Sequence, residues 1–205
     1  MERKRKVKRK AVISIALGMV IIFTMAACKA GEETEKDTGT GMSAETKNEN
    51  SLLAETGIPS FELSSLNLKD GVWDSVITNT DHGKNVSPQL SWDPVEGAGT
   101  YVIYMIDSSA DNWVHWISSD VTEPNLSEGW ATESEYIGPY PPDRTHTYEI
   151  YVIALKEPAT EVKGTLNAAD SRFKEKLLAL DEVADGSTGN MLAYGHLSGT
   201  YTAGD

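Results

Sequence analysis

The chain has 205 residues, of which 18 are Lys or Arg and 31 are Asp or Glu, giving a formal net charge of −13. A protein this acidic repels the phosphate backbone of nucleic acids at long range, so nucleic acid is excluded as an expected partner. The single cysteine, Cys28, precedes the predicted folded part, which therefore has no thiol for chemistry.

The N-terminal segment, residues 1–27, has the pattern of an export signal. A basic cluster over residues 2–10 precedes an apolar stretch that ends in Ala26-Ala27, directly before Cys28. This end resembles a bacterial lipobox, where the signal is cut before a cysteine that carries acyl chains such as palmitate. We therefore expect a lipoprotein that is anchored through Cys28 to the extracytoplasmic face of the cell membrane. The alternative is an uncleaved anchor, for which the apolar stretch is short.

A polar tether is predicted to follow the signal, over residues 28–51. Its first part is rich in Glu, Thr, Lys, Gly and Asn, and it has too few large apolar residues to offset the entropy of ordering. Without residues 1–27, which hold seven basic residues and one Glu, the chain retains 11 basic and 30 acidic residues, a net charge of −19. Any anion site must therefore be made locally, by a few aimed donors.

Residues 52–205 are predicted to form one β-rich domain with its own core. Short β-branched and aromatic runs are typical of strands, and turn sequences such as Asp93-Pro94 and the Gly138–Pro142 segment separate them. Helical spacing predicts one helix, with Asp170 or Ser171 as its cap. The predicted strands are Tyr101–Ile106, Val114–Ser118, Tyr148–Leu155 and Met191–Tyr201, and the predicted helix is Ala168–Leu180. The fold class is mainly β, a β-sandwich-like domain of antiparallel and mixed strands with a few peripheral helices.

Four ordered motifs resemble the phosphatidylethanolamine-binding protein family, in particular its bacterial Raf kinase inhibitor-like branch. The order and spacing agree over about residues 58–203. The motifs are Asn85-Val-Ser-Pro-Gln-Leu-Ser-Trp92, Asp107 followed by His115-Trp116, Gly138-Pro-Tyr-Pro-Pro142 followed by His146-Thr-Tyr148, and Leu197-Ser-Gly-Thr-Tyr201. One departure is visible: the family's D-P-D-x-P reads Asp107-Ser-Ser-Ala-Asp111 here, which changes the loop at the rim of the implied pocket.

The resemblance implies a small pocket that binds phosphate-type anions or phospholipid head groups. Protonated imidazoles donate from both ring nitrogens, and a carboxylate beside them holds their tautomers. The expected ligand-binding residues are Asp107, His115, Pro142, His146 and Tyr148, with Trp113, Trp116 and Tyr140 as pocket walls. A cis peptide is common in this region of the family, and the Tyr140-Pro141 bond is a candidate for one.

The preferred function is a binding module, and a regulatory role for it is left open. No cofactor or metal is expected. Two enzymatic alternatives use the same residues: a hydrolase with Ser108 or Ser109 as nucleophile, and a metal-dependent enzyme with Asp107, His115 and His146 as ligands. A protease or kinase inhibitor is a third alternative, with an unknown protein partner. Of the other histidines, His82 is a candidate to approach the pocket, and His196 is expected to be structural.

Overall fold

A six-stranded sheet is the central element of the computed structural model, which describes residues 50–202 and 204. Its strand order is β2-β3-β9-β8-β5-β6, and β3 and β9 run parallel while the other neighbours are antiparallel. The strands are β2 (Leu68–Lys69), β3 (Val72–Trp73), β5 (Thr100–Asp107), β6 (Trp113–Val121), β8 (Thr145–Leu155) and β9 (Met191–Thr202).

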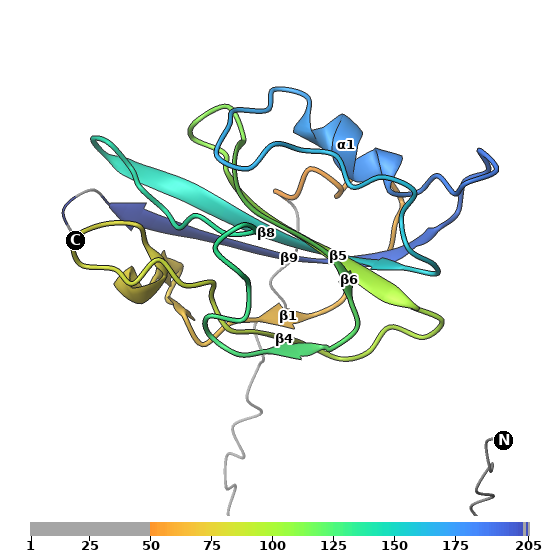
Figure 1. Cartoon of the computed structure of the whole chain (residues 1–205), viewed down its shortest axis with the longest axis horizontal. Coiled ribbons are helices and arrows are strands. Elements are labelled where there is room, and N and C mark those ends of the chain that lie inside the picture. The colour runs from red at the N-terminus through yellow and green to blue at the C-terminus, as the bar shows by residue number, and fades with distance from the viewer. Residues whose placement is uncertain (1–49, 203, 205) are drawn as a thin grey trace, which may run out of the picture. The chain divides into compact units, whose positions relative to one another are not determined.

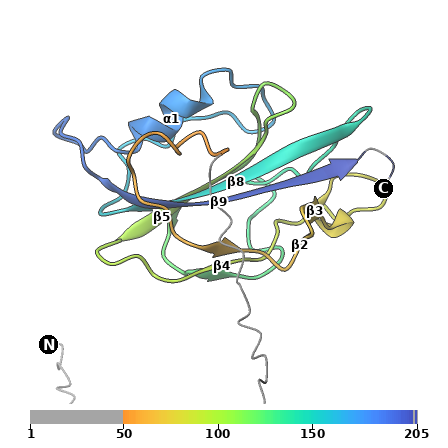
Figure 2. The ribbon, with the colours of Figure 1, turned by 180° about the vertical axis from the view of Figure 1, so that it is seen from behind.

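Both faces of this sheet are covered. A three-stranded sheet of β1 (Leu63–Ser64), β4 (Leu90–Trp92) and β7 (Asn125–Leu126) lies on one face, and helix α1 (Phe173–Ala179) lies on the other (Figures 1 and 2). Successive side chains of a strand point to opposite faces. In β5, Tyr101, Ile103 and Met105 therefore pack between the two sheets, while Val102, Tyr104 and Ile106 pack toward α1. Burial on both faces explains why β5 is apolar without alternation.

The predicted fold class is confirmed, and the long strands contain the predicted ones. The helix is shorter than predicted, because residues before Phe173 bond to β6 and its preceding loop: Val114 N donates to Ala168 O, and Asp170 N donates to Asp111 O. The structure places Arg172 at the N-cap, without a side-chain bond, so the predicted cap was wrong. The two-residue strands and the 3-10 helix η1 (Ser75–Ile77) escaped prediction because they are too short to show a period.

Residues 50–202 contain no cis peptide bond, so the Tyr140-Pro141 bond, a candidate for one, is trans. No helix in that part of the chain is long and apolar enough to cross a bilayer. The predicted signal, Cys28 and nearly all of the predicted tether lie outside the described residues. The described residues belong to one compact unit, Glu45–Asp205.

Candidate functional site

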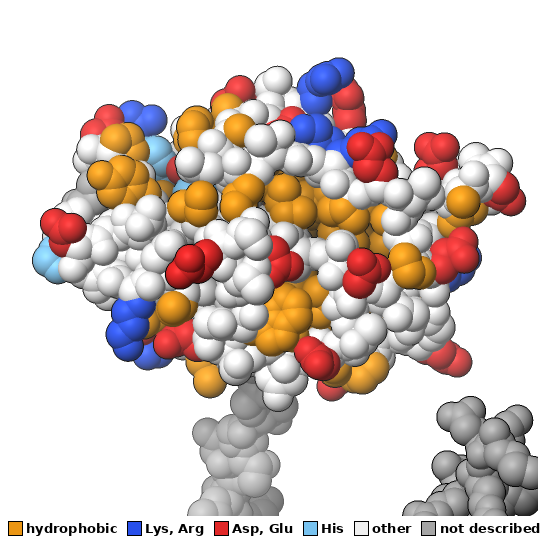
Figure 3. All heavy atoms as spheres, in the orientation of Figure 1, with side chains coloured by type: hydrophobic (Ala, Val, Ile, Leu, Met, Phe, Trp, Pro, Cys, Tyr) orange, Lys and Arg blue, Asp and Glu red, His pale blue; other side chains and the backbone are white. Residues whose placement is uncertain are grey.

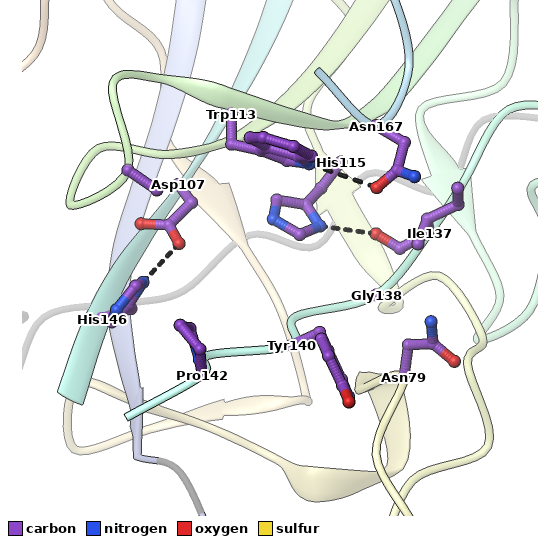
Figure 4. A pocket seen from close by; sticks show the side chains of 11 residues that line it. Asn79, Asp107, Trp113, His115, Ile137, Gly138, Tyr140, Pro142, His146 and Asn167 are labelled. Carbon is purple, nitrogen blue, oxygen red and sulfur yellow. Dashed lines mark hydrogen bonds and ion pairs between the residues drawn. The ribbon is translucent and has the colours of Figure 1, made fainter. Parts of the chain in front are cut away.

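A pocket of about 510 Å³ lies where three neighbouring strands of the large sheet begin or end. Asp107, the last residue of β5, is paired with Trp113 in β6 on one side and with Tyr148 in β8 on the other. This register brings together residues that are up to about 40 positions apart in the sequence. The pocket is lined by Asn79, Asp107, Ala110, Trp113, His115, Ile137, Gly138, Tyr140, Pro142, His146 and Asn167 (Figure 4).

Asp107 and His146 form a buried pair at one end of the pocket. His146 Nδ1 lies 2.6 Å from Asp107 Oδ2, and the backbone N–H of Ser109 donates to Asp107 Oδ1 at 2.9 Å. The carboxylate therefore fixes the proton of His146 on Nδ1. The other ring nitrogen, Nε2, is buried without a hydrogen bond and lies 3.6 Å from Asp143 Oδ1. His146 thus orients Asp107 through one nitrogen and faces a second carboxylate with the other.

His115 contributes an imidazole nitrogen that faces the pocket. Its Nδ1 lies 2.7 Å from the carbonyl oxygen of Ile137, to which it donates, and Nε2 faces the pocket (Figure 4). Burial lowers the pKa of His115, although the bond to Ile137 and the charge of Asp107 partly oppose this. The ring is therefore neutral at neutral pH, with a lone pair on Nε2. An anion in the pocket would favour proton uptake there.

Tyr148 lies behind the two histidines and does not line the pocket. Its ring centroid is 5.3 Å from that of His115 and 6.4 Å from that of His146, and the side chain is fully buried. The hydroxyl lies near Asp107 and the backbone of Tyr140 but meets no partner at hydrogen-bonding geometry. Burial, and then the charge of Asp107, raises the pKa of Tyr148. The phenol therefore stays protonated and supports the histidine rings.

The segment 137–142 forms the wall opposite Asp107 and depends on a glycine. A Cβ on Gly138 would lie 2.1 Å from the carbonyl oxygen of Ile77, so only glycine permits this approach. The Gly138 N–H donates to Asn85 Oδ1 at 2.7 Å, and Asn79 N donates to Pro139 O at 2.9 Å. Asn85, the first residue of the Asn85–Trp92 motif, thus holds this wall in place rather than contacting the pocket.

Two of the three expected wall residues line the pocket. Trp113 and Tyr140 do, and Trp113 Nε1 donates to Asn167 Oδ1 at 3.2 Å. Trp116 lies instead in the core between the sheets, where its ring meets Tyr136 edge-on at 5.6 Å. Trp116 follows His115 in β6, so the two side chains point to opposite sides of the strand.

Sequence reasoning missed five lining residues. Asn79 and Asn167 come from loops with no recognised motif, and Ala110 belongs to the altered loop after Asp107. Gly138 could have been found, because it begins the Gly-Pro-rich motif, and Ile137 directly precedes that motif. Of the remaining histidines, His82 does not line the pocket, and His196 Nε2 bonds to Glu149 Oε2 at 3.0 Å on the α1 side of the sheet.

Within residues 50–202, the groups that the two enzymatic alternatives require do not come together. Ser108 Oγ donates to the carbonyl oxygen of Thr147, and the backbone N–H of Thr147 donates to Ser109 Oγ. Neither hydroxyl is therefore hydrogen-bonded to a pocket histidine. No group of three or more His, Cys, Asp or Glu side chains within the described residues is placed to hold a metal ion. The site therefore combines a buried Asp–His pair, the pocket-facing nitrogen of His115, two aromatic walls and two asparagine side chains.

Comparisons with known proteins agree with this fold. The family model described as phosphatidylethanolamine-binding protein matches residues 70–202. A putative homologue of that protein from Chlamydia trachomatis is 25% identical over 69% of this chain and 97% of its own, with a TM-score of 0.52. YbcL from E. coli, described as a new member of the mammalian family, is 21% identical over 69% and 98%, with a TM-score of 0.52, and supports the fold. No curated protein sequence matches the chain.

Proposed function

The chain belongs to the phosphatidylethanolamine-binding protein family, and from this membership we propose that it is a binding module for a small phosphate-type anion, such as a phospholipid head group. The observation that carries the proposal is His115, a buried imidazole that bonds to Ile137 through Nδ1 and turns Nε2 toward the pocket. Proton uptake at Nε2 gives a charged donor aimed at the bound anion.

The negative charges around the pocket repel an anion unless His115 is protonated. Asp107 is buried next to the site and the chain as a whole is acidic, so an anion meets a repulsive field. His146 donates to Asp107 and thereby reduces the charge that this carboxylate presents to the pocket. A positive His115 then supplies the local attraction that the rest of the molecule does not.

Ligand-induced thermal shifts test the binding function. Millimolar phosphate or phosphoethanolamine should raise the melting temperature of the full-length protein, because a ligand at about 100 times its Kd stabilises the folded state by about 2.7 kcal/mol. His115→Ala should remove the shift, and the control His82→Ala, outside the pocket, should retain it. A shift that persists in His115→Ala, or no shift with either anion, contradicts the proposal.

The setting that we propose is the extracytoplasmic face of the cell membrane, with Cys28 as a lipid-modified N-terminus. The basic, apolar and small-residue pattern of residues 1–28 supports this, as does the polar composition of the segment that follows. A tethered binding module next to a bilayer would meet phospholipid head groups directly. Its own acidic charge would keep it from lying on an anionic membrane surface.

A further inference from the structure

The pocket is much larger than a phosphate ion. A water molecule occupies about 30 Å³ of liquid, so an anion of five heavy atoms fills a minor part of about 510 Å³. Pockets of about 300–1,000 Å³ ordinarily hold organic ligands and enclose most of their surface. The pocket therefore has room for an organic group next to the anion.

The polar groups of the pocket lie in two places. In Figure 4, Asp107 and His146 lie at one end, and Asn79 and Asn167 lie at the other. Among the described residues, the Asn79 side chain makes no hydrogen bond to protein, and Asn167 uses only its oxygen, which accepts from Trp113. The amide groups of these two residues, here called the amide end, are therefore free to bind a ligand.

Two aromatic side chains lie between these ends. In the view of Figure 4, Trp113 lies above His115 and Tyr140 lies below it. The Asn167 oxygen fixes the indole of Trp113, and Tyr140 leaves 66% of its surface exposed. A ring-shaped group can pack its faces against two such side chains at little cost in ordering, because Trp and Tyr have few rotatable bonds.

We propose that the ligand of this pocket is a sugar phosphate, an inference that rests on the proposed anion-binding function. The phosphate would lie at His115 Nε2, the faces of the sugar ring would pack against Trp113 and Tyr140, and the ring hydroxyls would bond to the amide end. Amides offer both donors and acceptors, which match hydroxyl groups. A phenyl ring would fill the same space but would leave both amides unused.

Isothermal titration calorimetry of the full-length protein with three probes tests this inference. The probes are inorganic phosphate, glucose 1-phosphate and phenyl phosphate. We expect glucose 1-phosphate to bind at least about tenfold more tightly than either of the others, which equals about 1.4 kcal/mol. Asn79→Ala and Asn167→Gly should each lower that ratio by about threefold or more.

The variants have matched controls. Asn125→Ala removes another exposed asparagine, from β7. Asp120→Gly controls for Asn167→Gly, since both residues have positive φ, 55° and 61°. Both controls should bind like the unaltered protein.

Three outcomes separate the two proposals. If glucose 1-phosphate binds no more tightly than phosphate, the sugar inference is wrong and the anion function stands. If phenyl phosphate binds as tightly as glucose 1-phosphate, or the amide variants keep the full ratio, the amide end has no role and the inference is wrong. If none of the three binds, the anion function itself is wrong.

Discussion

Three buried side chains of the pocket have different roles although all are polar. Asp107 accepts from the backbone and from His146, so its oxygens are occupied. His146 contacts a carboxylate with each ring nitrogen. The second nitrogen of His146 is buried beside Asp143, whereas His115 bonds to a main-chain carbonyl with one nitrogen and turns the other toward the pocket. Anion binding should therefore depend on the protonation of this one residue.

Sulfate affinity should rise as the pH falls from about 7.5 toward the pKa of His115, by up to about tenfold for each pH unit. Burial lowers the pKa of His115 below 6.5 in the protein without a ligand. The His115 imidazole is therefore neutral at pH 7 and takes up a proton when the anion binds. The charged groups that act on this ring are Asp107, which favours its protonation, and His146, which opposes it. Sulfate is the probe because its own charge is constant over this range.

The measurement is calorimetry at fixed ionic strength in two buffers of different ionisation enthalpy, which reports proton uptake directly. His115→Gln should bind sulfate weakly and show no pH slope. An equal slope in that variant would assign the titration to another group.

At the scale of elements, side chains of β8 make polar contacts on both faces of the sheet. Tyr148 points to the pocket side, and the next residue, Glu149, points toward the α1 side. Glu149 Oε2 accepts from Tyr151 Oη at 2.7 Å and from His196 Nε2 of β9 at 3.0 Å, while Tyr151 Oη accepts from the backbone N–H of Leu52 at 3.2 Å. This network links β8, β9 and the segment that leads into the domain.

Glu149→Gln should lower the free energy of unfolding by about 1–3 kcal/mol at pH 7. Burial raises the pKa of Glu149, but the bonds from His196 and Tyr151 outweigh this and the pKa is lowered from 4.5. The stabilisation is therefore present above pH 4.5 and lost as the pH falls through the folded-state value. The difference between the variant and the unaltered protein should accordingly shrink in acid.

Urea unfolding at several pH values measures this effect. A double-mutant cycle with His196→Gln should give a coupling energy of at least about 0.5 kcal/mol. Glu62→Gln, at an exposed position, is the control and should change little. Additive effects of the two single changes would contradict the network.

At the scale of the whole molecule, negative charge is in excess, with 31 Asp and Glu residues against 18 Lys and Arg residues. Figure 3 shows Asp and Glu side chains distributed over the visible face, with Lys and Arg in a few smaller groups. A broad field of this kind keeps anionic polymers and membranes away and leaves binding to a local site. Attachment to a membrane would then require the lipid.

Cys28→Ser should release the protein from the membrane fraction into the soluble fraction, because serine cannot carry the thioether-linked lipid of a lipoprotein. Fractionation followed by immunoblotting measures this, and mass spectrometry of the purified protein should find an acylated N-terminus at Cys28. Ser43→Ala, a hydroxyl change in the predicted tether, is the control. An unmodified Cys28 that is still joined to Ala27 would exclude the lipid anchor.

The sequence by itself determined the family, the fold class and the long strands. Their apolar runs are local patterns, and the motifs around Asp107, His115, Gly138 and His146 occur in a fixed order. These features can be recognised from the sequence because each depends on residues that are close together in the chain. The residues that begin or end β5, β6 and β8 could therefore be predicted as a candidate site before their contacts were known.

Only the tertiary structure decided which way the side chains face and what completes the pocket. The Trp116 side chain points into the core between the sheets, and the buried Tyr148 ring lies behind the histidines. Loops far apart in the sequence brought Asn79 and Asn167 to the pocket, held by backbone bonds to Pro139 and to Val114. Such placements come from long-range pairing and packing, which no local pattern records.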